Sequence, residues 1–438
     1  MKKLLNNLRV FSFWCIDWVK GGKIKNHYND IKFILENYNS MESFEKRTQY
    51  LNNILLHATT TTPYYRHLAE FKSLNDFPVI NKIIVREKYL EIQSETYLNR
   101  PKKKLQTSGS SGTPFTVLHD LNKTLRTTAD AIYFSEKSGF QIGNRLYFFR
   151  RWTKKHLKSR FYYWATNITI INVMDFSDKY LSHLINTLRK DNSNITFLGY
   201  PSAFRDICKY LDKTNASPVK INMSSIIGMG EAISDYVQES MEKYFCIPVL
   251  SRYSNNENGI LSQQLPHQGN YFHINWATYH IELLHPDKDI PVKHGELGRI
   301  VVTDLFNYSM PLIRYDTGDL GIMSDNNPYF NYAPAFTKIE GRKMDILYNT
   351  SGQPISSFLT NNMECFPEIK QFQLIQEDKT KYTIKLNIDE DFAHENKLRL
   401  KLKADLGDNA ELHFDYVNEI PQLSSGKRKL TINNYIKQ

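Results

Sequence analysis

ITFLGYPSAFRDICKYLDK, residues 195–213, joins a β-rich run to an amphipathic helical pattern. The first part, 195–200, has the β-branched and aromatic residues typical of a strand. Apolar residues then recur on one helical face over 202–213, and Ser202 is the expected N-cap. A strand followed directly by a helix is the repeating unit of a parallel sheet covered by helices. This segment therefore predicts an α/β fold.

The same unit recurs on both sides of this segment. Helices are expected at 177–190 and 232–245, with Ser177 and Ser234 as N-caps. Residues 28–57 also have helical periodicity. Further strands are expected at RLYFFR (145–150), ITIINV (168–173), SSIIGMG (224–230) and IPVLSRYS (247–254).

The pattern changes after residue 295. Three β-rich segments with Gly and Pro turns, at 295–305, 311–323 and 336–349, favour antiparallel strands or a small barrel. The last ninety residues predict strands at FQLIQE (372–377), KYTIKLNID (381–389) and 411–417, with a helix at 393–405. We therefore expect a large N-terminal domain of helix-covered sheets with a β-barrel-like subdomain (1–343), and a small, mobile α+β C-terminal domain (344–438).

Composition and charge exclude several classes of protein. With 41% hydrophobic and 13% aromatic residues, the chain is a folded globular protein and not a disordered one. Its four cysteines lack metal-site spacing, which favours reduced thiols in a cytoplasm. The net charge of +10 permits nucleic acid, anionic lipid or phosphate-bearing partners. No nucleic-acid motif accompanies the basic run at 150–160, so we set that class aside.

The N-terminal 25 residues have a basic start and a short apolar patch. Polar residues interrupt the patch and no small-residue cleavage site follows, so a signal peptide is not expected. Two alternatives remain open for this helix. It docks on its own domain, or it lies on a membrane surface with Phe11, Trp14 and Trp18 on the apolar side.

A glycine- and hydroxyl-rich stretch, LQTSGSSGTPF (105–115), follows the lysines Lys102, Lys103 and Lys104. Such a stretch is typical of a polar linker. It is equally typical of a loop whose backbone N–H groups wrap a phosphate chain, since glycine allows close approach and hydroxyls add donors. The stretch by itself does not distinguish the two.

Five later motifs carry polar residues that chemistry could use. Glu257 lies in a polar loop, Asp319 in a tight glycine-flanked turn, and Lys427 near the C-terminus. Singly, each is more typical of a surface carboxylate, a turn residue or a solvated charge. The motifs, in order, are GMGEAIS (228–234), RYSNNENG (252–259), RYDTGDLG (314–321), GRKMD (341–345) and PQLSSGKRK (421–429).

The ordered set resembles the adenylate-forming ligases, specifically the phenylacetate–CoA ligase-like branch that includes relatives found with capsular polysaccharide biosynthesis. The resemblance covers nearly the whole chain, and the last three motifs are shared widely across that superfamily. The segments that look like this branch in particular are LLHATTTTPYYRHL (55–68), FPVINKIIVREKYL (77–90), GYPSAF (199–204) and YSNNE (253–257).

The resemblance implies that a carboxylic acid and ATP form an acyl-adenylate, and that the acyl group then passes to a thiol, a sugar or another acceptor. ATP and Mg²⁺ are the implied cofactors, with CoA as a co-substrate. Lys427 would stabilise the transition state, Glu257 would hold Mg²⁺, and Asp345 would be a hinge. The implied ATP- or AMP-binding residues are Thr107, Ser108, Gly109, Ser110, Ser111, Gly112, Thr113, Gly230, Glu231, Tyr253, Asp319 and Arg342.

Two departures from the family pattern leave alternatives open. Thr113 stands where the phosphate loop usually has lysine, and Ser-Asn-Asn lies between Tyr253 and Glu257 where smaller residues are common. Besides a ligase serving surface polysaccharide assembly, the alternatives are a plain aryl- or acyl-CoA ligase and a non-catalytic nucleotide-binding partner protein. We expect a cytoplasmic location, with peripheral contact at the inner membrane face compatible with each.

Overall fold

The computed structural model describes residues 2–107, 115–152, 157–342, 347–355, 363, 366, 368–388, 392–421 and 430–435. The chain divides into two compact units. The first comprises Met1–Leu146, Lys158–Ile168 and Leu250–Ile339, and the second comprises Tyr147–Leu157, Thr169–Val249 and Glu340–Gln438.

A mostly antiparallel sheet forms the centre of the first unit, as the pattern after residue 295 predicts. Its strands follow the order β10-β11-β12-β13-β9-β8-β7, and a separate two-stranded hairpin, β1-β2, accompanies them. The strands are β1 Lys103–Thr107, β2 Phe115–His119, β7 Val249–Asn255, β8 Gly259–Gln264, β9 Phe272–Ile274, β10 Tyr279–Leu284, β11 Leu297–Asp304, β12 Tyr315–Ser324 and β13 Ala335–Arg342.

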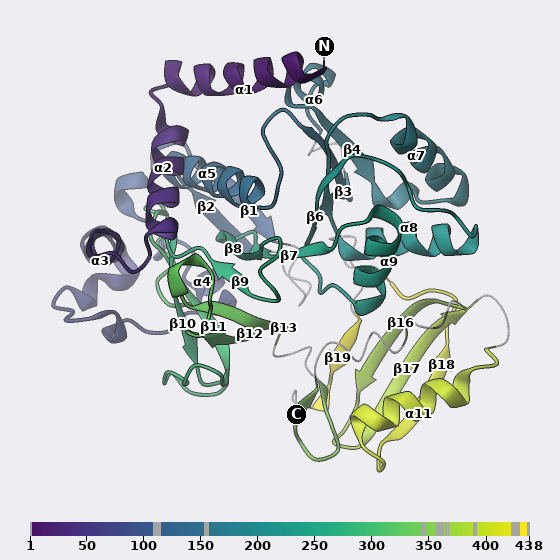
Figure 1. Ribbon diagram of the computed structural model, residues 1–438. Coiled ribbons are helices and arrows are strands. Elements are labelled where there is room, and N and C mark those ends of the chain that lie inside the picture. Colours follow the sequence, from purple (N-terminus) through teal and green to yellow (C-terminus); the bar gives the residue numbers. More distant parts are fainter. Residues whose placement is uncertain are drawn as a thin grey trace. The chain divides into compact units, whose positions relative to one another are not determined.

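Helices α2 and α5 pack on this sheet because each presents an apolar stripe to it (Figure 1). Ile34 and Phe134 are buried there against Leu261 and Val302 of the sheet. The periodic segment 28–57 spans two helices, and Ser40 caps the second. The helices are α1 Lys2–Val19, α2 Lys23–Glu36, α3 Met41–Thr61, η1 Pro63–Leu68, η2 Leu74–Asp76, α4 Lys82–Glu87, η3 Glu95–Tyr97, α5 Leu121–Lys137, α6 Arg160–Thr166 and η6 Phe330–Tyr332.

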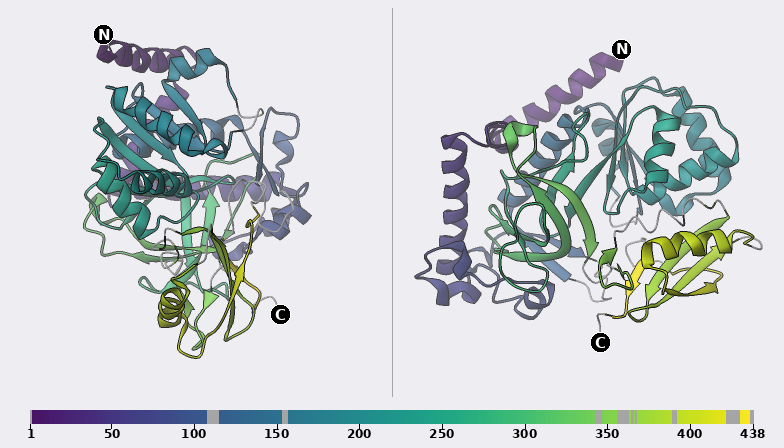
Figure 2. Two further views of the ribbon diagram at one scale, coloured as in Figure 1. Left: turned by 90° about the vertical axis from the view of Figure 1, so that its right-hand side faces the viewer. Right: turned by 60° about the horizontal axis from the view of Figure 1, so that its bottom comes forward.

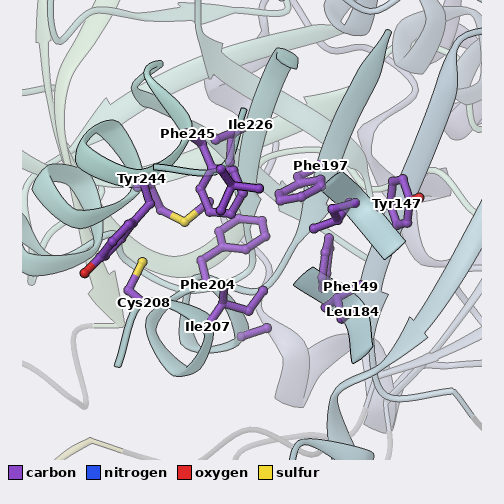
Figure 3. Close-up of a cluster of buried hydrophobic side chains, with 14 of the residues drawn as sticks. Tyr147, Phe149, Leu184, Phe197, Phe204, Ile207, Cys208, Ile226, Tyr244 and Phe245 are labelled. Atoms are coloured by element: carbon purple, nitrogen blue, oxygen red, sulfur yellow. The ribbon is translucent and has the colours of Figure 1, made fainter. Parts of the chain in front are cut away.

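The second unit contains the strand–helix repeats, and the predicted α/β class is confirmed. Its strands follow the order β6-β5-β3-β4, and β5 and β6 are parallel. Figure 3 shows the core between strands and helices, where the ring of Phe149 contacts the rings of Phe197 and Phe204 edge to face. The elements are β3 Arg145–Arg150, β4 Ile168–Asn172, η5 Val173–Asp175, α7 Asp178–Lys190, β5 Ile195–Gly199, α8 Pro201–Lys213, β6 Met223–Met229 and α9 Asp235–Phe245.

Two of the three predicted helix caps are confirmed. The side chains of Ser177 and Ser234 accept hydrogen bonds from backbone N–H groups in the first turns of α7 and α9. The prediction for Ser202 is wrong, because α8 begins at Pro201 with Tyr200 as its N-cap. Proline suits the first helical position, where its missing N–H would have no intrahelical partner.

The C-terminal part of the second unit has a four-stranded sheet of order β18-β17-β16-β19 with α11 beside it (Figure 2). Leu374 and Ile384 of the sheet pack against Leu398 and Leu402 of α11. The predicted strands and helix are confirmed here, whereas β19 was not predicted. The elements are β14 Leu347–Tyr348, β15 Pro354–Ile355, β16 Ile369–Gln376, β17 Lys381–Ile388, α11 Glu395–Leu406, β18 Glu411–Tyr416 and β19 Thr431–Asn433.

No helix among the described residues is long and apolar enough to cross a membrane. The boundary between domains at 343–344 stays a prediction.

Candidate active site

Glu257 lies in the middle of the three-residue tip that joins β7 to β8. The Asn255 side chain closes this turn by accepting a hydrogen bond from the backbone N–H of Asn258, at 2.7 Å. Gly259 has a φ of 115°, and a Cβ there would lie 3.1 Å from the Tyr279 hydroxyl. One asparagine of the unusual Ser-Asn-Asn sequence therefore has a local structural role.

The Glu257 carboxylate is held by a phenol and an ammonium group. The residue is only 2% exposed, and its Oε1 lies 3.2 Å from both the Tyr315 hydroxyl and Lys82 Nζ. Burial, and then the Glu257 charge, raise the pKa of Tyr315 well above its ordinary value. Tyr315 thus stays protonated and donates to the carboxylate.

Lys82 reaches this site because a distant strand fixes the backbone just before it. Ile80 donates its N–H to the Arg314 carbonyl at 3.0 Å and accepts from the Asp316 N–H at 2.7 Å. The Asn81 side chain then caps α4, of which Lys82 is the first residue. Sequence reasoning missed Lys82, since nothing local distinguishes it from other surface lysines.

Asp319 lies beside Tyr253. The Tyr253 hydroxyl donates to Asp319 Oδ2 at 2.7 Å, and it also lies 3.3 Å from the Thr317 hydroxyl. Burial and the Asp319 charge raise the pKa of Tyr253, so the phenol remains a donor. Asp319 therefore has a fixed phenol donor at one of its oxygens.

The prediction that Asp319 lies in a tight turn is wrong. The residue lies inside β12, where residues 317–319 bulge out opposite Ile300 of β11. Gly318 adopts a φ of 81° in the bulge, and the Thr317 hydroxyl accepts the Asp319 N–H at 3.1 Å. Bulges commonly re-aim a side chain beside an active site.

Positions 108–114 lie outside the described residues, and so does the side chain of Thr107. The flanking strands β1 and β2 pair antiparallel, with Thr107 opposite Phe115, and both belong to the first unit. The interpretation of this stretch as a linker between domains is therefore wrong. At the other end of β2, His119 Nε2 lies 2.8 Å from the Glu257 carbonyl oxygen. This contact joins the β1–β2 hairpin to the tip that carries Glu257.

Two backbone carbonyls bind the side chain of Lys102, the first of the three lysines that precede this stretch. Its ammonium donates to the carbonyls of Tyr97 and Leu98 at 2.6 and 2.9 Å. Lys103 and Lys104 are exposed on β1. They are the lysines near the loop whose side chains face solvent.

His119 makes stability sensitive to acid. Burial, and then Lys123, lower the pKa of His119 from 6.5 to about 4. Between these values the unfolded chain binds a proton that the folded chain does not, so this part of the stability is present above pH 6.5 and is lost as pH falls. We expect His119→Gln to flatten the pH dependence of the unfolding free energy by about 1.4 kcal/mol per pH unit.

Urea unfolding of both proteins between about pH 5 and 7 measures this difference. The other histidines contribute equally to both proteins, and glutamine can still donate to the Glu257 carbonyl. Parallel pH profiles would contradict the assignment.

The remaining predicted residues fall into three groups. Gly230 and Glu231 belong to the second unit, where Gly230 has a φ of 77° and Glu231 Oε2 accepts the Ser202 N–H at 3.0 Å in the first turn of α8. Arg342 ends β13, and its side chain is outside the described residues, as are Asp345 and Lys427 entirely. Their roles stay predictions.

Glu257 is the residue that we expect to hold Mg²⁺, and the residues around it bear on this prediction. Among the described residues, no group of three or more His, Cys, Asp or Glu side chains is arranged to hold a metal ion. Mg²⁺ does not require such a group, because it commonly uses one or two carboxylates together with substrate phosphates and waters. A single carboxylate at the hairpin tip suits Mg²⁺ that arrives with ATP.

Comparison with solved structures identifies the fold. The chain superposes on a crystal structure of 2-hydroxyisobutyryl-CoA ligase, in the postadenylation state in complex with R3-HIB-AMP, with a TM-score of 0.70, 16% identity and coverage of 90% of both chains. The chain has the fold of the adenylate-forming ligases. ATP-bound MatB from Rhodopseudomonas palustris is also similar, with a TM-score of 0.54 and 13% identity over 74% of this chain and 66% of that one.

Comparisons of the sequence find a relative along nearly the whole chain. Protein CapK of Staphylococcus aureus is 24% identical over 436 residues, covering 94% of this chain and 93% of that protein. Residues 347–434 match the family model described as the CapK C-terminal domain. The resemblance to the adenylate-forming ligases is thereby confirmed, while the phenylacetate–CoA ligase-like branch stays a prediction.

Proposed function

We propose that this protein activates a carboxylic acid with ATP as an acyl-adenylate and transfers the acyl group to an acceptor. The observation that carries the proposal is the pair of phenol–carboxylate contacts, Tyr253 with Asp319 and Tyr315 with Glu257, on the fold of the adenylate-forming ligases. Each carboxylate is aligned by a buried phenol of the protein itself. Such preorganisation favours the attack of the substrate carboxylate on the α-phosphorus of ATP.

The two carboxylates, Asp319 and Glu257, have different roles in this proposal. Asp319 would accept hydrogen bonds from the ribose hydroxyls, because a carboxylate accepts several hydrogen bonds. Tyr253 would keep this carboxylate oriented and would lie near the adenine. Mg²⁺ bound at Glu257 would neutralise phosphate charge, which otherwise repels the attacking carboxylate. Lys427 would add a positive charge between the carboxylate and the α-phosphate. Arg342 would assist at the ribose, and Gly230 and Glu231 would contribute to nucleotide binding.

The acceptor is a thiol in our proposal, because the structural relative with the higher TM-score is named as a CoA ligase. A phenylacetate-like aryl substrate and a sugar acceptor are the alternatives. The likeness to CapK favours a role in capsular or surface polysaccharide biosynthesis. We place the protein in the cytoplasm at the inner face of the membrane.

ATP–pyrophosphate exchange across a panel of aryl, fatty and amino acids tests the first half-reaction. We expect exchange with one acid class, and loss of exchange in Lys427→Ala, because removing an electrostatic contact to the transition state lowers the rate by about a hundredfold or more. CoA, sugars and carrier proteins are then compared as acceptors.

Two results would contradict the proposal. Exchange that persists undiminished in Lys427→Ala would remove that residue from the reaction. Failure of the wild-type protein to bind Mg–ATP in calorimetry would exclude adenylation and favour a non-catalytic partner protein.

A further inference from the structure

Helix α1 packs on the first unit through one face only. Asp17 on this face is buried and accepts the backbone N–H groups of Ile24 and Lys25 at 3.0 and 2.9 Å. The Trp14 ring lies 6.0 Å from the Tyr28 ring. Trp14 therefore belongs to the packed face, and its expected place on the free apolar side is wrong.

The opposite face of α1 is apolar and exposed. Leu4, Leu8, Phe11 and Trp18 recur at helical spacing, and their exposed fractions are 64, 51, 68 and 78%. Soluble helices normally turn such a stripe toward a core. A contiguous exposed apolar face of this kind marks an interaction surface.

Helix α6 lies beside α1 and carries two further exposed aromatic residues. The Arg9 guanidinium donates to the Trp164 carbonyl at 3.0 Å and lies 5.9 Å from the Trp164 ring, which fixes α6 beside α1 (Figures 1 and 2). Phe161 and Trp164 of α6 are 72 and 59% exposed. We call these six residues, Leu4, Leu8, Phe11, Trp18, Phe161 and Trp164, the N-terminal aromatic face.

Basic residues outnumber acidic ones in the two segments that carry the face. Residues 1–25 contain six Lys or Arg and one acidic residue, Asp17, whose carboxylate is buried. Residues 157–166 add Lys158 and Arg160 and contain no acid. Within residues 2–25 and 157–166, the exposed cations among the described side chains are Lys20, Lys23, Lys25, Lys158 and Arg160.

We propose that the N-terminal aromatic face binds the surface of an anionic lipid bilayer. Tryptophan and phenylalanine insert at the boundary between headgroups and acyl chains, while lysine and arginine attract anionic headgroups. Charge complementarity selects this occupant over a second copy of the chain, which would bring two basic surfaces together. Carrying the active site on a membrane surface would suit an acceptor embedded in that membrane.

Cosedimentation of the full chain with lipid vesicles tests the proposal without ATP or an acid, so it is independent of the proposed activity. We expect binding to phosphatidylcholine vesicles that contain phosphatidylglycerol, weakened by added salt, and weak binding to pure phosphatidylcholine. The double variant Phe11→Glu/Trp18→Glu should bind about tenfold more weakly or worse, because it removes two aromatic side chains from the apolar contact and adds repulsion.

Phe44→Glu is the matched control. Phe44 of α3 is 57% exposed and lies outside the N-terminal aromatic face, so its variant should bind like the wild type. Unchanged thermal unfolding of both variants would show that each folds.

Three results would overturn the proposal. They are equal binding to charged and neutral vesicles, unchanged binding of the double variant, and a reversible dimer of the wild type that the double variant loses. The last result would assign the face to a second copy of the chain.

Discussion

Replacing Glu257 with glutamine is expected to remove the Mg²⁺ dependence of ATP binding and to lower ATP–pyrophosphate exchange by about a hundredfold. Glutamine keeps the size of the side chain and an oxygen that accepts from Tyr315, so the hairpin tip should fold unchanged. What disappears is the negative charge that attracts a divalent cation. Calorimetry with ATP, in the presence and absence of Mg²⁺, measures this effect before the carboxylic acid is known.

Tyr315→Phe is the control for this prediction. It removes the hydrogen bond to Glu257 at 3.2 Å and leaves the carboxylate charge, so we expect a several-fold effect only. If Glu257→Gln binds Mg–ATP like the wild type, the carboxylate does not contact the metal. The 3.2 Å contact with Lys82 would then be its main role.

The largest expected loss of stability follows from Lys123→Met. Lys123 and Asp304 have fully buried side chains, and Lys123 Nζ lies 2.6 Å from Asp304 Oδ2. Lys123 also donates to the Tyr279 hydroxyl at 3.0 Å. Methionine fills much of the volume but leaves the Asp304 charge buried without its cation, so we expect a loss of about 3–5 kcal/mol in urea unfolding.

Lys137→Met provides the comparison, because Lys137 pairs with Glu36 at 2.7 Å where both side chains are about one-third exposed. Water screens this pair, and its removal should change stability by about 1 kcal/mol or less. Removing both charges in Lys123→Met/Asp304→Leu should recover part of the loss. Equal effects of the two single substitutions would contradict the buried-pair argument.

Local patterns predicted the elements of the fold because the physics that forms them is local. The caps Ser177 and Ser234 and the alternating strands and helices follow from neighbouring residues alone. The start of α8 was misplaced at Ser202, since Pro201 competes for the same turn and begins the helix. The side of α1 that packs was also misjudged for Trp14, because helical periodicity says which residues share a face and not which face is covered.

The candidate site was predictable only in part, since its contacts join residues far apart in the chain. Glu257, Tyr253 and Asp319 were identified through ordered motifs. Lys82 was not, because it reaches Glu257 only after Ile80 pairs with the backbone on either side of Tyr315. Tyr315 lies inside the motif RYDTGDLG (314–321), but its contact with Glu257 depends on the burial of its side chain, which the motif does not indicate.

The hairpin tip that carries Glu257 has little conformational freedom in the folded protein. His119 contacts the carbonyl of Glu257, and Tyr279 donates to the carbonyl of Asn258, so two successive peptide groups are tied to the body of the first unit. Ordering a loop on binding weakens affinity, and a loop ordered during folding avoids that loss. Directed evolution toward a different carboxylic acid should therefore keep residues 255–259 constant. The substitutions should be introduced at other positions, where the backbone is not held in this way.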